Sequence, residues 1–99
     1  MNARIEKQDN RLNVIGELNS QTVPKLWRES SAVIKSAGEN LLFDLQGVSR
    51  SDSAGVALLI DWMRQARACA LEIRFRNLPE QMLDIIKVSD LESVIPLAE

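Results

Sequence analysis

A cluster of hydroxyl and acidic side chains stands between two apolar segments in the middle of the chain. Ser49, Ser51, Asp52 and Ser53 precede an apolar run that begins at Val56. A serine acts as a nucleophile when a neighbouring base takes its proton, and histidine is the usual base. The chain contains no histidine, and no lysine or carboxylate is singled out as a base by its spacing. The cluster therefore favours binding over catalysis, and we predict that the protein is not an enzyme.

The remaining residues with chemical potential give no stronger site. Two carboxylate pairs are available for acid/base work, Asp44 with Asp52 and Asp61 with Asp84, but surface or capping roles are commoner for such residues. Gly55 stands alone, outside the glycine patterns that cradle a dinucleotide or a triphosphate. Cys69 is the only cysteine, so we expect a half-buried thiol near a helix end and neither a disulfide nor a zinc site. We predict no cofactor and no metal.

Two roles are open to the cluster itself. Asp52 or Ser51 can cap the following helix by accepting from its free N–H groups, a contribution of about 1 kcal/mol. A helix N-terminus also favours negative charge, so a phosphate on Ser53, carrying about −1.5 to −2 charges, would be accommodated there. The residue types fit both roles equally well.

The helix that follows offers a possible binding face. Three small residues near its start would let another surface approach the backbone: Ala54, Gly55 and Ala57. Its predicted core stripe, at helical spacing, is Val56, Leu59, Ile60 and Met63. Leu58 and Trp62 are i, i+4 neighbours to one side of that stripe, so they form either an exposed apolar strip for a partner or the margin of the core.

Hydrophobic periodicity predicts the elements that position these residues. Strands are expected at residues 4–7, 12–18, 40–45 and 71–77, and helices at residues 23–37 and 53–68. Thr22 is the predicted cap of the first helix, and Trp27 lies on its core flank. Asn77 and Glu80 have the spacing of a capping box for a short third helix. Residues 90–99 are ambiguous, with one more short strand possible. Strand-helix-strand units imply an α/β fold with a parallel or mixed sheet.

Length, charge and hydropathy limit the partners. The 99 residues suit one domain, and the formal net charge is −2, which provides no broad basic surface for nucleic acid. No apolar run approaches the ~20 residues that span a bilayer, and the first residues do not resemble a signal peptide. We expect a single-domain cytoplasmic protein without direct membrane insertion.

The pattern resembles the STAS domain family of sulphate transporters and anti-sigma factor antagonists. The resemblance covers residues 5–95 and rests on "RLNVIGELN", a first helix, and then "LLFDLQGVSRSDSAGVALL". Its most specific part is the block from Asp52 to Gly55. It implies a mixed sheet of about four to five strands with helices packed mainly on one face. It also implies that Ser53 is phosphorylatable and that Asp52 and Gly55 belong to a recognition surface.

Within that family, the short chain, the "GVALLIDWM" helix and Trp27 after "VPKL" look most like the STAS subunits of Mla-type phospholipid transporters. The resemblance implies a cytoplasmic accessory subunit, at the inner membrane through its complex, that binds the ATPase of an ABC transporter maintaining outer-membrane lipid asymmetry. The expected contact surface comprises Ser51, Asp52, Ser53, Ala54, Gly55, Ala57, Leu58 and Trp62. Ala54 departs from the commonest antagonist motif, which has serine there.

Two alternatives stay open. The first is a stand-alone anti-sigma factor antagonist that a partner kinase switches off by phosphorylating Ser53. The second is a small-molecule or nucleotide sensor that uses a cleft between residues 19–22 and the start of the Ser53 helix.

Overall fold

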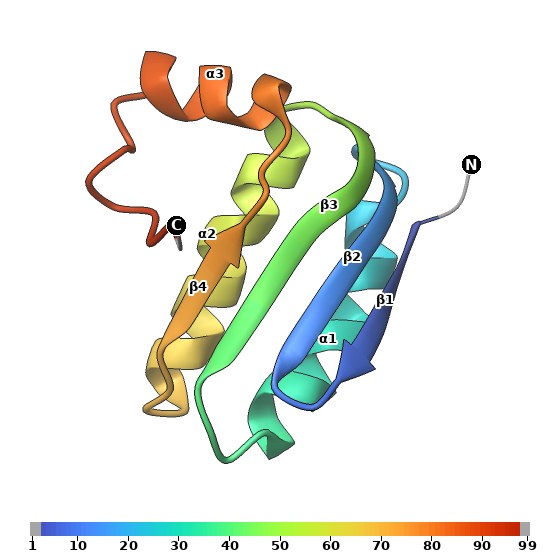
Figure 1. Cartoon of the computed structure of the whole chain (residues 1–99), viewed down its shortest axis with the longest axis vertical. Helices are drawn as coiled ribbons and strands as arrows, with labels where there is room; N and C mark the ends of the chain where they lie inside the picture. The colour runs from blue at the N-terminus through green and yellow to red at the C-terminus, as the bar shows by residue number, and fades with distance from the viewer. Residues whose placement is uncertain (1–2, 98–99) are drawn as a thin grey trace.

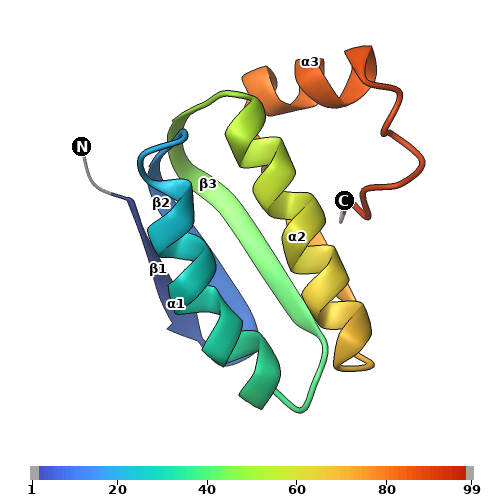
Figure 2. The same ribbon diagram turned by 180° about the vertical axis from the view of Figure 1, so that it is seen from behind.

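The chain folds into one mixed sheet with two helices on one of its faces (Figures 1 and 2). The computed structural model describes residues 3–97. Its elements are β1 (Ala3–Gln8), β2 (Arg11–Leu18), α1 (Val23–Ser36), β3 (Leu41–Ser51), α2 (Ser53–Ala68), β4 (Ile73–Arg76) and α3 (Glu80–Val88). The strands lie in the order β1-β2-β3-β4, with β1 antiparallel to β2 and the other pairs parallel. The α/β fold with a mixed sheet, predicted from the sequence, is confirmed.

The two ends of α1, the helix that connects β2 to β3, are set by hydrogen bonds and backbone angles of nearby residues. α1 begins after Thr22, but the Thr22 hydroxyl does not cap it as predicted. Instead that hydroxyl accepts from the Asn19 N–H at 3.0 Å and donates to the Glu17 carbonyl at 2.7 Å, which fixes the preceding loop. Gly38, two residues after the end of α1, has a φ of 69°, a value that favours glycine.

β3 is longer than the predicted strand and reaches the candidate site directly. The apolar alternation ends at Leu45, yet pairing with β2 continues to Ser51. The register shifts between Asn13 and Ile15 and again between Gly16 and Glu17. Such irregularities bend a strand and interrupt the regular alternation of buried and exposed side chains. The polar residues after Leu45 therefore show no alternation from which a strand could be predicted.

The core between sheet and helices is centred on three aromatic rings. Phe43 on β3 lies 4.3 Å from Trp62 on α2 and 5.7 Å from Phe75 on β4, measured between ring centroids. Trp62 and Leu58 are both 0% exposed, so of the two alternatives the exposed apolar strip is excluded, and neither residue belongs to the accessible contact surface expected from the sequence. α2 packs on the sheet and beside α1 together, and its buried face is therefore rotated toward Leu58 and Trp62. Met63, placed at its centre by the sequence, is only half-buried.

The indole nitrogen of Trp62 is a polar atom inside this core, and it has one hydrogen-bond partner there. Its indole N–H donates to the Ser30 hydroxyl of α1 at 2.6 Å, and that hydroxyl donates in turn to the Trp27 carbonyl at 3.1 Å. Ser30 is itself fully buried. This short chain of hydrogen bonds joins the two helices over the sheet.

Trp27 lies outside the core, contrary to the sequence prediction. Its side chain is 41% exposed. The buried face of α1 is formed by Leu26, Ser30 and Ile34, and Trp27 stands at the edge of that face because it is one residue beyond Leu26.

The end of the chain departs from the predicted capping box. α3 begins at Glu80 with Pro79 as its N-cap residue and no side-chain cap. Asn77 instead has a φ of 58° and donates through its amide to the Asp44 carboxylate at 3.1 Å. The possible last strand is a single parallel bridge between Phe75 and Leu97, and residues 98–99 of that segment lie outside the described residues.

We predict that Ser30→Ala lowers the free energy of unfolding by about 1–3 kcal/mol, because it leaves the buried Trp62 N–H without an acceptor. Urea titration followed by tryptophan fluorescence measures the loss. Ser36→Ala on the same helix is the control, since Ser36 is exposed and its hydroxyl bonds only to α1 carbonyls. Equal stability of the two variants would show that the Trp62 hydrogen bond contributes nothing.

Candidate partner-binding site

The junction between β3 and α2 presents the hydroxyl cluster at one end of the sheet. Asp52 caps α2: its carboxylate accepts from the Ala54 N–H at 2.8 Å. The Asp52 N–H donates to the Leu18 carbonyl at 3.2 Å, which ties the junction to the end of β2. The predicted capping role therefore belongs to Asp52. Its side chain is nevertheless exposed, so it remains available to a partner.

Ser51 has a structural role and does not lie on the surface. It is buried, and its hydroxyl donates to the Asp52 carbonyl at 3.1 Å. Its backbone N–H donates to the Gln81 side-chain oxygen at 2.9 Å, a contact that links β3 to α3. The sequence placed Ser51 in the partner-binding set, and its burial removes it from the accessible surface.

Gly55 serves close packing. A Cβ at this position would overlap the Ser51 hydroxyl and would lie 3.1 Å from the Leu18 Cβ. The first turn of α2 can therefore approach β2 and β3 only without a side chain here. Like Ser51, Gly55 is buried and cannot contact a partner directly. Its contribution to the predicted recognition surface is to position the turn that carries Ser53.

Ser53, Ala54 and Ala57 form the accessible part of the predicted site. Ser53 and Ala57 are exposed and Ala54 is half-buried. Within the described residues, the Ser53 hydroxyl makes no hydrogen bond to the protein, so it is free to meet a partner or to accept a modification. The small side chains around it keep this end of α2 low in relief.

Trp27 adds an aromatic ring that the sequence analysis had assigned to the core. Ser31, one turn after Trp27 on the same flank of α1, donates its hydroxyl to the Gln65 side-chain oxygen of α2 at 2.9 Å. That flank therefore faces α2. Trp27 lies in the first half of α1, and α1 and α2 run side by side in the same direction (Figure 2). We call the surface formed by Trp27, Asp52, Ser53, Ala54 and Ala57 the α1/α2 tip.

Two hollows could hold a ligand, one beside this tip and one far from it. One of about 410 Å³ lies beside it, where the sequence predicted a sensor cleft, and its lining includes Asn19, Arg50 and Asp52. The Asn19 side-chain oxygen is already committed to the loop, since it accepts from the N–H groups of Gln21 at 2.8 Å and Thr22 at 3.1 Å. The sensor hypothesis stays a prediction.

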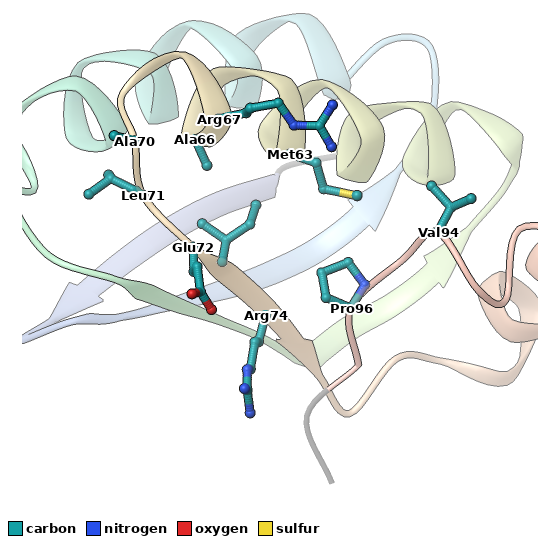
Figure 3. Close-up of a pocket in the computed structure, with 10 residues that line it drawn as sticks. Met63, Ala66, Arg67, Ala70, Leu71, Glu72, Arg74, Val94 and Pro96 are labelled. Atoms are coloured by element: carbon teal, nitrogen blue, oxygen red, sulfur yellow. The ribbon is translucent and has the colours of Figure 1, made fainter.

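The larger hollow, of about 520 Å³, lies at the opposite end of α2 from Ser53. Its lining includes Met63 and Arg67 of α2, Ile73 of β4, and Val94 and Pro96 near the end of the chain, while the Arg74 side chain points away from α2 (Figure 3). Its lining mixes apolar and charged side chains and includes none of the hydroxyl cluster. It is therefore separate from the α1/α2 tip.

Comparison with known proteins places this geometry in a family. A family model described as MlaB, STAS domain, matches residues 1–97. The chain belongs to the MlaB family of STAS domains. No curated protein sequence matches it. No helix in residues 3–97 combines the length and apolarity needed to cross a bilayer.

Solved structures of STAS proteins share the fold. A chain of the Acinetobacter MlaFEDB complex, in an ATP-bound conformation, is 26% identical with a TM-score of 0.78, over 91% of this chain and 95% of that one. The Bacillus cell fate determinant SpoIIAA in its phosphorylated form is 23% identical with a TM-score of 0.70, over 98% and 91%. The unphosphorylated form of the anti-sigma factor antagonist SpoIIAA is 20% identical with a TM-score of 0.70, over 98% and 87%. The SpoIIAA likeness concerns the fold alone.

We predict that Gly55→Ala destabilises the protein by about 1–3 kcal/mol, because the added methyl group overpacks the junction. Removing the Ser51 hydroxyl in the double variant Gly55→Ala with Ser51→Ala should restore part of the loss, and a double-mutant cycle by urea unfolding measures the coupling. Ala57→Ser, also on α2 but exposed, is the control and should change stability little. Additive effects of the two substitutions would contradict the proposed close contact.

Proposed function

We propose that this STAS domain is a non-catalytic subunit that binds the ATPase of an Mla-type ABC transporter. In this role it would be a cytoplasmic protein held at the inner membrane by its complex and would support phospholipid transport that maintains outer-membrane lipid asymmetry. The family match over residues 1–97 and the likeness to a chain of the MlaFEDB complex support this assignment. The structural observation that carries it is the α1/α2 tip, which presents an exposed tryptophan on α1 and an unengaged hydroxyl at the start of α2.

The physical properties of the tip suit a protein partner. Tryptophan is enriched among the residues that dominate binding energy, because one rigid ring buries a large area. Trp27 is 41% exposed although the other tryptophan is fully buried, so a partner would gain apolar area that folding leaves in water. The small residues Ala54 and Ala57 allow the partner backbone to approach, and the Ser53 hydroxyl can donate or accept a hydrogen bond.

We predict that Trp27→Ala and Ser53→Arg each abolish co-purification with the ATPase subunit of an Mla-type transporter from the same genome. The first removes the exposed ring, at a cost of at least ~2 kcal/mol for a residue that dominates an interface. The second puts a long charged side chain on a surface of small residues. Both sites are accessible, so circular dichroism should show folded variants. Co-expression and affinity purification of the tagged ATPase measures the effect.

Val88→Ala is the matched control for the ring truncation. Val88 is 88% exposed and lies on α3, away from the tip, so its truncation should leave co-purification unchanged. Retention of the ATPase by both tip variants would exclude the α1/α2 tip as the interface. Failure of the unmodified chain to bind the ATPase would exclude the assignment itself.

A second candidate function is anti-sigma factor antagonism controlled by phosphorylation of Ser53. The exposed, unengaged Ser53 hydroxyl favours it, together with a fold shared with SpoIIAA in phosphorylated and unphosphorylated forms. Here the partner would be an anti-sigma factor kinase in place of the ATPase.

Phosphorylation of Ser53 separates the two candidates. For an antagonist, incubation with a cognate anti-sigma kinase and ATP should add one phosphate to the chain and none to Ser53→Ala, as read by intact-mass spectrometry. Ser49→Ala, on an exposed serine of the same junction, controls for site selectivity and should still be modified. Under the transporter assignment the chain binds its ATPase without any modification of Ser53.

A further inference from the structure

The face of the sheet that points away from α1 and α2 concentrates positive charge. Figure 1 looks onto this open face, and no described helix crosses it. Leu12, Phe43 and Phe75 are buried toward the helices, so their strand neighbours point to the open face. The charged residues of this face are arginines at positions 4, 11, 50, 74 and 76 and carboxylates at positions 6, 17, 44 and 72. Five arginines against four carboxylates leave a charge of +1 here, whereas the whole chain carries −2.

Two of the carboxylates of the open face, those nearest Arg11 and Arg76, are already engaged. Glu6 forms an ion pair with Arg4 at 3.0 Å. Asp44 is only 8% exposed, and one of its oxygens accepts both the Gln46 N–H at 2.9 Å and the Asn77 side-chain amide at 3.1 Å. Asp44 therefore holds a bend in β3 against the loop that follows β4, and it does not neutralise an arginine.

Three of the other arginines have no such partner. Among residues 3–97, no carboxylate lies within 4.0 Å of the side-chain nitrogens of Arg11, Arg74 or Arg76. One terminal nitrogen of Arg11 donates to the Gln8 side-chain oxygen at 3.0 Å, but its Nε is buried without any hydrogen-bond partner. Because the Nε is closed to solvent, an acceptor from a partner would reach Arg11 through its terminal nitrogens.

Arg11 and Arg76 border one hollow. Its volume is about 460 Å³, and its lining also includes the carboxylates of Glu6 and Asp44 and the amides of Asn13, Gln46 and Asn77. Asn13, Asp44 and Arg76 are direct neighbours across β2, β3 and β4, so they form one row over the sheet. The amides provide donors and acceptors suited to a peptide backbone, and the arginines provide forked donors suited to carboxylates.

The arginine spacing matches an extended chain. Arg74 and Arg76 are two residues apart on β4, so their Cα atoms are separated by about 6.6–6.8 Å along the strand. Alternate side chains of an extended peptide have the same interval. An acidic residue at every second position would therefore place successive carboxylates opposite successive arginines.

We propose that the open face of the sheet binds an extended acidic segment of a partner protein, with Asp or Glu at alternate positions. Its carboxylates contact Arg11 and Arg76 beside the hollow and Arg74 along the edge strand. Every basic residue among the charged groups of this face is arginine, the residue whose planar fork matches carboxylate geometry. The site lies on the opposite side of the sheet from the α1/α2 tip, so it is independent of the proposed function.

Fluorescence anisotropy with a labelled ten-residue peptide of alternating Glu and Thr tests the proposal. The full chain should bind this peptide and should not bind its Lys-Thr counterpart. Arg11→Gln with Arg76→Gln should weaken binding by about tenfold or more, since each charge-assisted contact contributes ~1.5 kcal/mol or more. Arg28→Gln with Arg64→Gln, which removes the same charge from the helix side, should change affinity less than about twofold by loss of long-range attraction.

Several results would overturn the proposal. The first is that the unmodified chain does not bind the acidic peptide. The second is that the two double variants weaken peptide binding equally. The third is that the chain binds phosphatidylglycerol vesicles through Arg11 and Arg76 but does not bind the peptide. Arg74→Gln guards against misfolding of the double variant, because Arg74 is exposed. It should weaken peptide binding by about threefold while leaving urea stability unchanged, as expected of a rim charge, and an unchanged affinity would count against the site.

Discussion

The hydrogen bond between Trp62 and Ser30 is the constraint on which the arrangement of the helices depends. Trp62 is fully buried and stacks against the aromatic rings of β3 and β4, so its indole N–H has no access to water. The Ser30 hydroxyl of α1 is its acceptor at 2.6 Å. A buried ring that needs a polar partner from another element fixes both distance and rotation between two helices. That fixed approach brings Trp27 and the start of α2 into one surface.

Local sequence rules predicted the elements of this fold well and the faces of its helices poorly. The hairpin and the extent of α2 follow from alternation, turn residues and capping, which depend on near neighbours in the chain. The sequence predicted the wrong side for Trp27 and left the side of Trp62 open, because both have apolar neighbours at helical spacing. Contacts far away in the chain, with Ser30 and with the rings of Phe43 and Phe75, bury Trp62. The polar second half of β3 was missed for a similar reason, since its pairing with β2 includes two register shifts, each with one extra residue on β3.

The residues of the candidate site also differ in whether near neighbours in the chain or distant residues determine their roles. Asp52 as a cap was predictable, because a cap needs only the turn that follows it. The function of Gly55 was not, because the atoms that exclude a side chain there belong to Ser51 and to Leu18 of another strand. The arginines of the open face are scattered in sequence, and the net charge of −2 hides them. Pairing of four strands gathers them, so a chain without a basic segment still has a basic surface.

The geometry at Ser53 determines what a phosphate there would do. Asp52 already accepts the Ala54 N–H, so a phosphate on Ser53 would meet an occupied cap and an adjacent carboxylate. The helix dipole would offset part of that repulsion, with 0.3–1 kcal/mol as its typical size near a surface. The modification would therefore leave the fold in place and would add about −1.5 to −2 charges to the α1/α2 tip. A partner whose surface fits a neutral hydroxyl beside Trp27 would lose affinity through desolvation of that charge. The same tip is thus compatible with partner binding that is always on and with binding that phosphorylation switches off. The difference between the two lies in whether a kinase recognises Ser53.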